Sequence, residues 1–211
     1  IFNAIPPNWF ANISKLEYDG RHLLERFTEH AHNIKSLSFG FHTFTQKLIS
    51  KISSLISFQN NLVDLDLYLG YNEDYIDSDI NTSDISEVIL TLIEKVHSLK
   101  SLSLASGGNG IVQDFKELEM LSRHSNLERL NLRNVEFTVN DYDDFSIDIK
   151  FSKLVSLELF DVRMASQYSE KSLIHLIEQM MKNSNLISLD LEPYIGDNYD
   201  KLLEFIPSYC T

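Results

Sequence analysis

A short pattern of apolar and variable positions occurs seven times along the 211 residues of the chain. Each copy has an aliphatic residue, two variable residues, Leu, one variable residue and a final apolar residue, and the copies are residues 13–18, 34–39, 62–67, 99–104, 127–132, 154–159 and 186–191. The alternation that ends each copy has the two-residue period of a β-strand with one buried face. A single strand cannot bury its leucines alone, so we expect the copies to stack side by side.

Most intervals between the copies carry the i, i+3, i+4, i+7 apolar spacing of an amphipathic helix. These stripes predict helices near residues 24–31, 44–56, 85–96, 115–121 and 173–180. The interval 135–151 has no such stripe. There Phe145, Ile147, Ile149 and Phe151 alternate with polar residues, so we expect an extended segment and no helix on the convex side.

The copies begin about 29 residues apart on average, at the upper edge of the range for leucine-rich repeats. We therefore expect an α/β leucine-rich-repeat solenoid, a horseshoe arc with parallel strands on the concave face and helices on the convex face. A single domain over 1–211 is expected to contain about seven irregular repeats at 13–191, a flank at 1–12 and a closing segment at 192–211. Because the chain begins at Ile1 rather than Met, we expect it to be part of a longer protein.

Several copies, together with the polar residues before them, resemble leucine-rich repeats of the ribonuclease-inhibitor-like superfamily. These are the phrases at residues 60–67, 125–132 and 183–191. They are most similar to the irregular repeats that follow an F-box in ubiquitin-ligase substrate receptors. The ladder Asn or Cys of that superfamily, three residues after the last core Leu, is replaced by Gly70, Gly107, Val135, Val162 and Tyr194. The resemblance implies a substrate-recognition domain whose ligase adaptor docks on a segment missing here.

Composition restricts the classes of partner. The net charge of −13 argues against nucleic acid, because phosphate binding requires Lys and Arg, and it favours a basic protein partner. A single cysteine, Cys210, cannot form the disulfide-rich caps that extracellular repeat proteins commonly carry, so we expect an intracellular location, cytoplasmic or nuclear. No apolar run approaches the ~18 residues of a membrane span, so no membrane partner is expected.

Two acidic stretches with aromatic residues, 68–87 and 134–149, each follow a predicted strand and are expected to project from the same rim. They are interpreted as solvated insertions, with an acidic rim for a basic partner as the alternative. The sequence from Asp77 to Asn81 opens like a calcium-binding loop. However, Thr82 replaces the required Gly and Val88 replaces the bidentate Glu, which argues against calcium.

Strand residues between the core leucines are expected to face the concave side, where solenoids commonly bind their partners. Tyr, Phe and Arg supply much of the energy at interfaces, which favours Tyr68, Arg129, Arg133 and Phe160 as contacts. The alternative at each position is a polar residue that only keeps the sheet soluble. The candidate partner-binding residues are Asp64, Asp66, Tyr68, Lys100, Glu128, Arg129, Asn131, Arg133, Glu158, Phe160 and Asp190.

Catalytic and cofactor motifs are weak in this sequence. The glycine-rich segment 105–110 lacks the Lys and Ser or Thr of a phosphate-binding loop, and a rim turn explains it. His30 and His32 lack a second pair of ligands at metal-binding spacing. We therefore predict no catalytic, cofactor-binding or metal-binding residues and no enzyme activity.

Three functions remain open from the sequence. The first is the substrate receptor of an F-box-type ubiquitin ligase. The second is a free-standing scaffold or inhibitor that binds a basic protein, and the third is a GTPase-activating leucine-rich-repeat protein. All three rest on analogy between folds, which is a weak basis for function.

Overall fold

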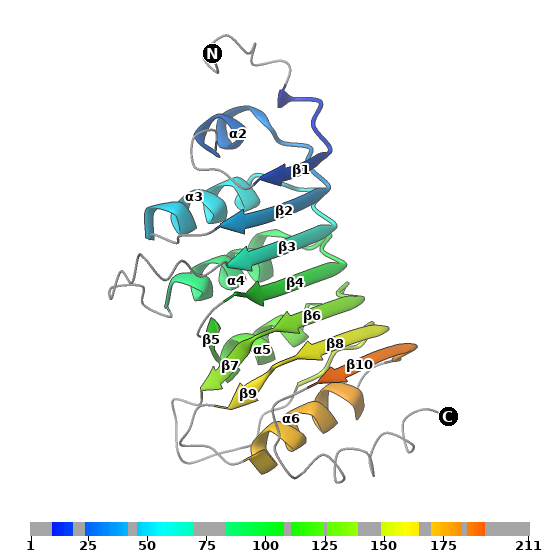
Figure 1. Ribbon diagram of the computed structural model, residues 1–211. Coiled ribbons are helices and arrows are strands. Elements are labelled where there is room, and N and C mark those ends of the chain that lie inside the picture. The colour runs from blue at the N-terminus through cyan, green and yellow to red at the C-terminus, as the bar shows by residue number, and fades with distance from the viewer. Residues whose placement is uncertain are drawn as a thin grey trace.

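The computed structural model describes residues 10–18, 24–41, 46–69, 83–107, 111–124, 126–138, 149–164, 170–182 and 185–192. The main feature of these residues is a parallel sheet of seven strands, one for each copy of the pattern (Figure 1). In spatial order the strands are β1 (Lys15–Tyr18), β2 (Ser36–Phe41), β3 (Asp64–Leu69), β4 (Ser101–Ser106), β6 (Arg129–Arg133), β8 (Ser156–Phe160) and β10 (Ser188–Glu192).

Helices cover one side of this sheet, as Figure 1 shows. They are α2 (Leu24–His30), α3 (Gln46–Ser57), α4 (Ser83–Lys95), α5 (Phe115–Ser122) and α6 (Glu170–Lys182). Each lies where an apolar stripe predicts it. The alternation of strand and helix along an open parallel sheet confirms the predicted α/β leucine-rich-repeat solenoid. The proposed limits of the flank, the repeats and the closing segment stay predictions.

The leucines at the fourth position of the pattern form one column across the sheet. The strand register aligns Leu16, Leu37, Leu65, Leu102, Leu130, Leu157 and Leu189. The five from Leu37 to Leu157 are at most 1% exposed. Leu189, on the edge strand β10, is only partly buried. Full burial of one leucine contributes about 1.5–3 kcal/mol, so the column is a main source of stability.

A second, smaller sheet departs from the predicted pattern. The short parallel strands β5 (Ile111–Asp114), β7 (Val135–Thr138) and β9 (Arg163–Met164) form it. Asn134, directly before β7, has a φ angle of 52°. Asp161, two residues before β9, has a φ angle of 49°. Asn and Asp tolerate this left-handed conformation better than most residues, so the chain can turn sharply there.

The interval 135–151 contains strand β7 and, further on, the buried side chains of Ile149 and Phe151. Neither described part of this interval is helical, and the predicted lack of a helix over the whole interval stays a prediction. The alternating residues Phe145 and Ile147 lie outside the described residues. Val135 and Val162, three residues after the last core Leu of their copies, are fully buried.

Two buried polar side chains join neighbouring repeats in the loops before the strands. Gln59 lies three residues before the first aliphatic position of its copy. Its Oε1 accepts a hydrogen bond from the Ile34 N–H at 2.9 Å, and its Nε2 donates one to the Ala31 carbonyl at 2.6 Å. At the same position of a later copy, His124 Nε2 lies 2.6 Å from the Val96 carbonyl. These contacts satisfy backbone groups that would otherwise be buried without partners.

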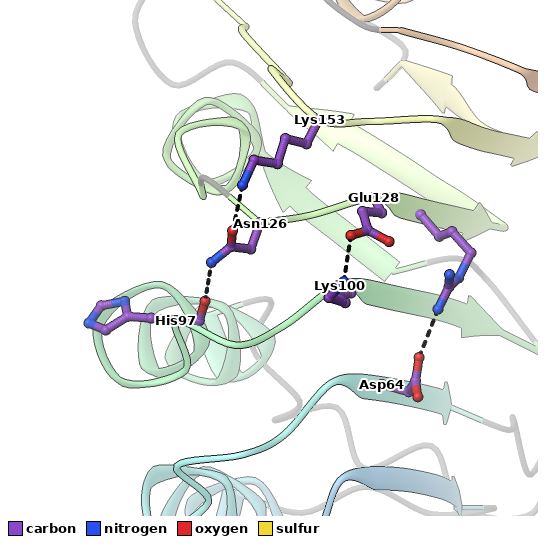
Figure 2. Close-up of polar contacts among 7 residues, drawn as sticks. Asp64, His97, Lys100, Asn126, Glu128 and Lys153 are labelled. Carbon is purple, nitrogen blue, oxygen red and sulfur yellow. Dashed lines mark hydrogen bonds and ion pairs between the residues drawn. The ribbon is translucent and has the colours of Figure 1, made fainter.

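A second series of hydrogen bonds runs through the same loops. In three copies the residue just before the first aliphatic position donates to a backbone carbonyl of the preceding repeat, and Figure 2 shows the example between Asn126 and His97. We call this series the loop ladder. Its bonds are Ser98 Oγ to the Asn60 carbonyl (3.2 Å), Asn126 Nδ2 to the His97 carbonyl (2.7 Å) and Asn185 Nδ2 to the Ser152 carbonyl (3.4 Å).

Replacing Gln59 by Leu is expected to lower the free energy of unfolding by about 2–3 kcal/mol, because the Ile34 N–H and the Ala31 carbonyl lose their buried partner. Asn61→Leu is the matched control, since Asn61 is exposed and lies two residues away. It should change stability by no more than about 0.5 kcal/mol. Urea unfolding followed by circular dichroism measures both, and equal effects would contradict the role given to Gln59.

Candidate functional site

The face of the main sheet opposite the helices is the candidate binding surface, and we call it the inner face. Its residues alternate with the core leucines, so the strand register arranges them in levels across the sheet. One level contains Asp64, Ser101, Arg129, Ser156 and Ser188. The next contains Asp66, Ser103, Asn131, Glu158 and Asp190, and the third contains Tyr68, Ala105, Arg133, Phe160 and Glu192.

Nine of the eleven candidate residues lie within strands on the inner face. They are Asp64, Asp66, Tyr68, Arg129, Asn131, Arg133, Glu158, Phe160 and Asp190. Lys100 and Glu128 lie immediately before β4 and β6, at the edge where the strands begin. The structure therefore brings the candidates onto one surface but places these two at its border.

An ion pair crosses three strands of the inner face. Arg129 Nη2 on β6 lies 3.0 Å from Asp64 Oδ1 on β3. Ser101 of β4 occupies the same level between them, and its short side chain leaves room for the arginine to reach across. Figure 2 shows Asp64 receiving this contact. The pair neutralises one of the two arginines that the sequence favours as contacts.

The other basic candidates also have partners within the chain. Arg133 Nη2 lies 3.4 Å from Glu158 Oε2, and its Nε donates to Asn131 Oδ1 at 3.2 Å. Lys100 Nζ donates to Glu128 Oε1 at 2.7 Å. The centre of the inner face is thus less basic than its Lys and Arg residues suggest. Exposed ion pairs of this kind contribute about 0–1 kcal/mol, so a partner can rearrange them at low cost.

Two large apolar surfaces remain exposed at the third level. Tyr68 is 44% exposed and Phe160 is 47% exposed. Three strand spacings separate them, which corresponds to about 14 Å. Arg133 lies between them in the register, next to Phe160. Aromatic residues with a neighbouring arginine are enriched at protein–protein interfaces.

The last strand adds a residue that the sequence interpretation missed. Ile187, just before β10, is 88% exposed. The equivalent positions of other copies hold Lys35, Lys100 and Glu128, so an isoleucine at this polar position is the signal that could have identified it. Asp190 and Glu192 are exposed nearby on β10. This end of the inner face combines carboxylates with exposed apolar surface.

Other chemistry considered from the sequence finds little support. In the part of the chain that the structure describes, no group of three or more His, Cys, Asp or Glu residues could hold a metal ion. His32 packs its ring against Phe58, and His30 lies beside Glu29 and the ring of Phe10. The calcium-like segment near Asp77, most of both acidic stretches, Gly108 to Gly110 and the closing segment after Glu192 lie outside the described residues.

None of the helices in the described ranges has the length and apolar character needed to cross a membrane.

Comparisons with known proteins give one named structural similarity. No protein-family model matches the chain. No curated protein matches it either. Among solved structures, the chain is similar to the leucine-rich repeat-containing protein LegL7 from Legionella pneumophila, with 10% sequence identity and a TM-score of 0.29 over 99% of this chain and 96% of that one. The strand register and the position of the helices, rather than this similarity, establish the fold.

The Lys100–Glu128 pair has a measurable effect on ionisation. The hydrogen bond from Lys100 lowers the pKa of Glu128 below its ordinary value, against the smaller opposing effect of burial. Because the folded-state pKa of Glu128 is lowered, the contribution of the pair to stability is present above the ordinary pKa. It is lost as the pH falls through the lowered one.

Lys100→Met is therefore expected to return the pKa of Glu128 toward its ordinary value, which a carbon-detected NMR titration of the Glu128 carboxyl group measures. Lys35→Met is the matched control, because Lys35 occupies the same position of another copy. It should leave the pKa of Glu128 unchanged. An unchanged pKa in the Lys100 variant would show that the pair does not form in solution.

Proposed function

We propose that this domain is a non-enzymatic protein-interaction module that holds its partner on the inner face. The observation that carries the proposal is the uncovered parallel sheet with Tyr68, Arg133 and Phe160 at one level. Parallel sheets of α/β proteins normally have both faces covered. Here the helices cover one face, and the other face presents polar residues with two exposed aromatic rings.

The shape of the inner face favours a protein over a small molecule. Its levels run across seven strands, so its contact groups are spread over a broad surface rather than gathered in a pocket. Small-molecule sites are concave and bury most of the ligand. Protein interfaces instead combine a few aromatic and arginine contacts with a surrounding polar rim. Tyr68 and Phe160 have the properties of such contacts, and Asp66, Asn131 and Asp190 have those of a rim.

We infer that, within a longer chain, the module is the substrate-recognition part of an F-box-type ubiquitin-ligase receptor. The support for this finer function is the resemblance of the irregular repeats to those that follow an F-box. The unequal lengths of the segments between strands agree with it. In this role the inner face holds the substrate, and a segment outside this sequence docks the ligase adaptor.

The alternative is a free-standing scaffold that binds a basic protein. The carboxylates Glu158, Asp190 and Glu192, together with the net charge of −13, favour it. Electrostatic attraction of this kind weakens as salt is added. A partner whose affinity depends steeply on salt supports the scaffold, whereas a salt-insensitive partner that is ubiquitinated supports the receptor.

Replacing Tyr68 and Phe160 together by Ala is expected to weaken binding of the cellular partner by at least about tenfold, because both exposed rings leave the contact surface. Met120→Ala is the control, since its side chain is 37% exposed but lies on α5, outside the inner face. Partners identified by mass spectrometry with the unaltered protein supply the ligand for surface plasmon resonance. Equal loss in both variants would exclude the inner face.

The receptor role makes a separate prediction about the full-length protein. Cells that express it should contain it in a complex with a ligase adaptor, and its partner should become more stable when the protein is depleted. Quantitative immunoprecipitation and a protein-synthesis chase measure these two effects. A partner that binds the inner face but keeps the same half-life after depletion would contradict the receptor role and leave the interaction module intact.

A further inference from the structure

The loops that lead into the strands have a charge opposite to that of the chain. We define the basic edge as the positions from four residues before to one residue after the first aliphatic residue of each copy. In the seven copies these positions contain seven Lys or Arg residues and one acidic residue, Glu128, although the chain has 18 Lys and Arg against 31 Asp and Glu. The basic residues are Lys35, Lys95, Lys100, Arg123, Lys150, Lys153 and Lys182.

The fold aligns these residues along one edge of the solenoid. In four consecutive repeats the residue four positions before the first aliphatic residue is basic and exposed. These residues are Lys95, Arg123, Lys150 and Lys182. The loop ladder holds the same loops together through hydrogen bonds between consecutive repeats. Backbone hydrogen bonds at the strand entries, such as Glu128 N–H to the Lys100 carbonyl at 2.8 Å, extend this alignment. The cations of the fourth to seventh copies therefore form a row, and Lys35 lies apart from it because the third copy has no Lys or Arg at these positions.

Favourable interaction with helix dipoles explains only part of this row. Lys95 and Lys182 lie in the last turns of α4 and α6, where a cation is stabilising. Lys153 follows described residues without helical structure, and Lys35 and Lys100 lie at strand entries. A capping role does not account for these three. Their common feature is their place on the edge.

Neutralisation within the chain is incomplete. Arg123 is paired with Glu119 and Lys100 with Glu128. Lys153 donates instead to the neutral side chain of Asn126 at 2.8 Å, so no carboxylate neutralises it in this contact. Figure 2 shows Lys100, Asn126 and Lys153 in three consecutive loops. The edge thus keeps a net positive charge in an acidic protein.

We propose that the basic edge binds an acidic segment of a protein partner, at a surface distinct from the inner face. Within about 8–10 Å, the Debye length at moderate salt, the cations of the edge dominate the potential that a short segment experiences. A long polyanion such as nucleic acid extends beyond that distance and meets the repulsion of the remaining chain, whose total charge is −13. An acidic peptide is therefore the ligand that fits the edge.

Fluorescence anisotropy with the full chain and a labelled peptide of alternating Glu and Ser tests the proposal at an ionic strength of about 0.1 M, where the Debye length is about 10 Å. Lys95→Glu with Lys182→Glu is expected to weaken peptide binding by about tenfold. The matched control is Lys47→Glu with Lys116→Glu, which changes the net charge equally at exposed positions near the starts of α3 and α5. The control should change the affinity by less than about twofold. Equal losses in the two variants, or no loss in either, would overturn the proposal.

Two further pairs of substitutions separate a loss of peptide binding at the basic edge from a folding defect and from an effect of the inner face. Lys95→Gln with Lys182→Gln avoids an acidic residue at a helix end and should still weaken binding, with an unchanged circular dichroism spectrum as the measure of folding. Tyr68→Ala with Phe160→Ala should leave peptide binding unchanged, because these rings lie on the inner face. A single-stranded oligonucleotide is tested in the same way. If it binds more tightly than the peptide, and if the edge variants lose this binding, the edge belongs to nucleic acid and the proposal is refuted.

Discussion

The in-register column of leucines is the interaction on which the rest of this structure depends. Each strand exposes too much apolar surface to be stable alone, and only its neighbours in the column can cover it. Because side chains alternate across a strand, fixing Leu65, Leu102 and Leu130 in the interior places their neighbours on the inner face. The position of every candidate contact residue within a strand therefore follows from the burial of leucine.

The same stacking produces two other surfaces. Parallel strands all begin at one edge, so the loops that enter them lie next to each other, and any residue type repeated in those loops becomes a row. Hydrogen bonds made by Gln59, Asn126 and Asn185 fill this edge with contacts between repeats. The cations on its exterior, Lys95 and Lys153 among them, occupy the positions that these contacts leave in solvent.

On the inner face, charge and apolar surface have separate roles. The basic residues at its centre are held by carboxylates of other strands, as in the Arg129–Asp64 pair. Such pairs maintain solubility and orient side chains, but at high exposure they add little stability. Tyr68 and Phe160 instead leave apolar area in water that only a partner can cover. The aromatic residues are thus the main energetic basis of the proposed interaction, and the charges select its partner.

The sequence by itself determined the strands, the helices and the column of leucines, because each depends on a local period that one residue type repeats. It also placed Tyr68 and Phe160 on the inner face. Tertiary structure decided the contacts between repeats, such as Arg129 reaching Asp64 across Ser101, since no local period records which side chains meet across three strands. It likewise decided the second sheet, because its strands pair across repeats and no local period records that pairing; Asn134 and Asp161 have positive φ angles just before the buried Val135 and Val162.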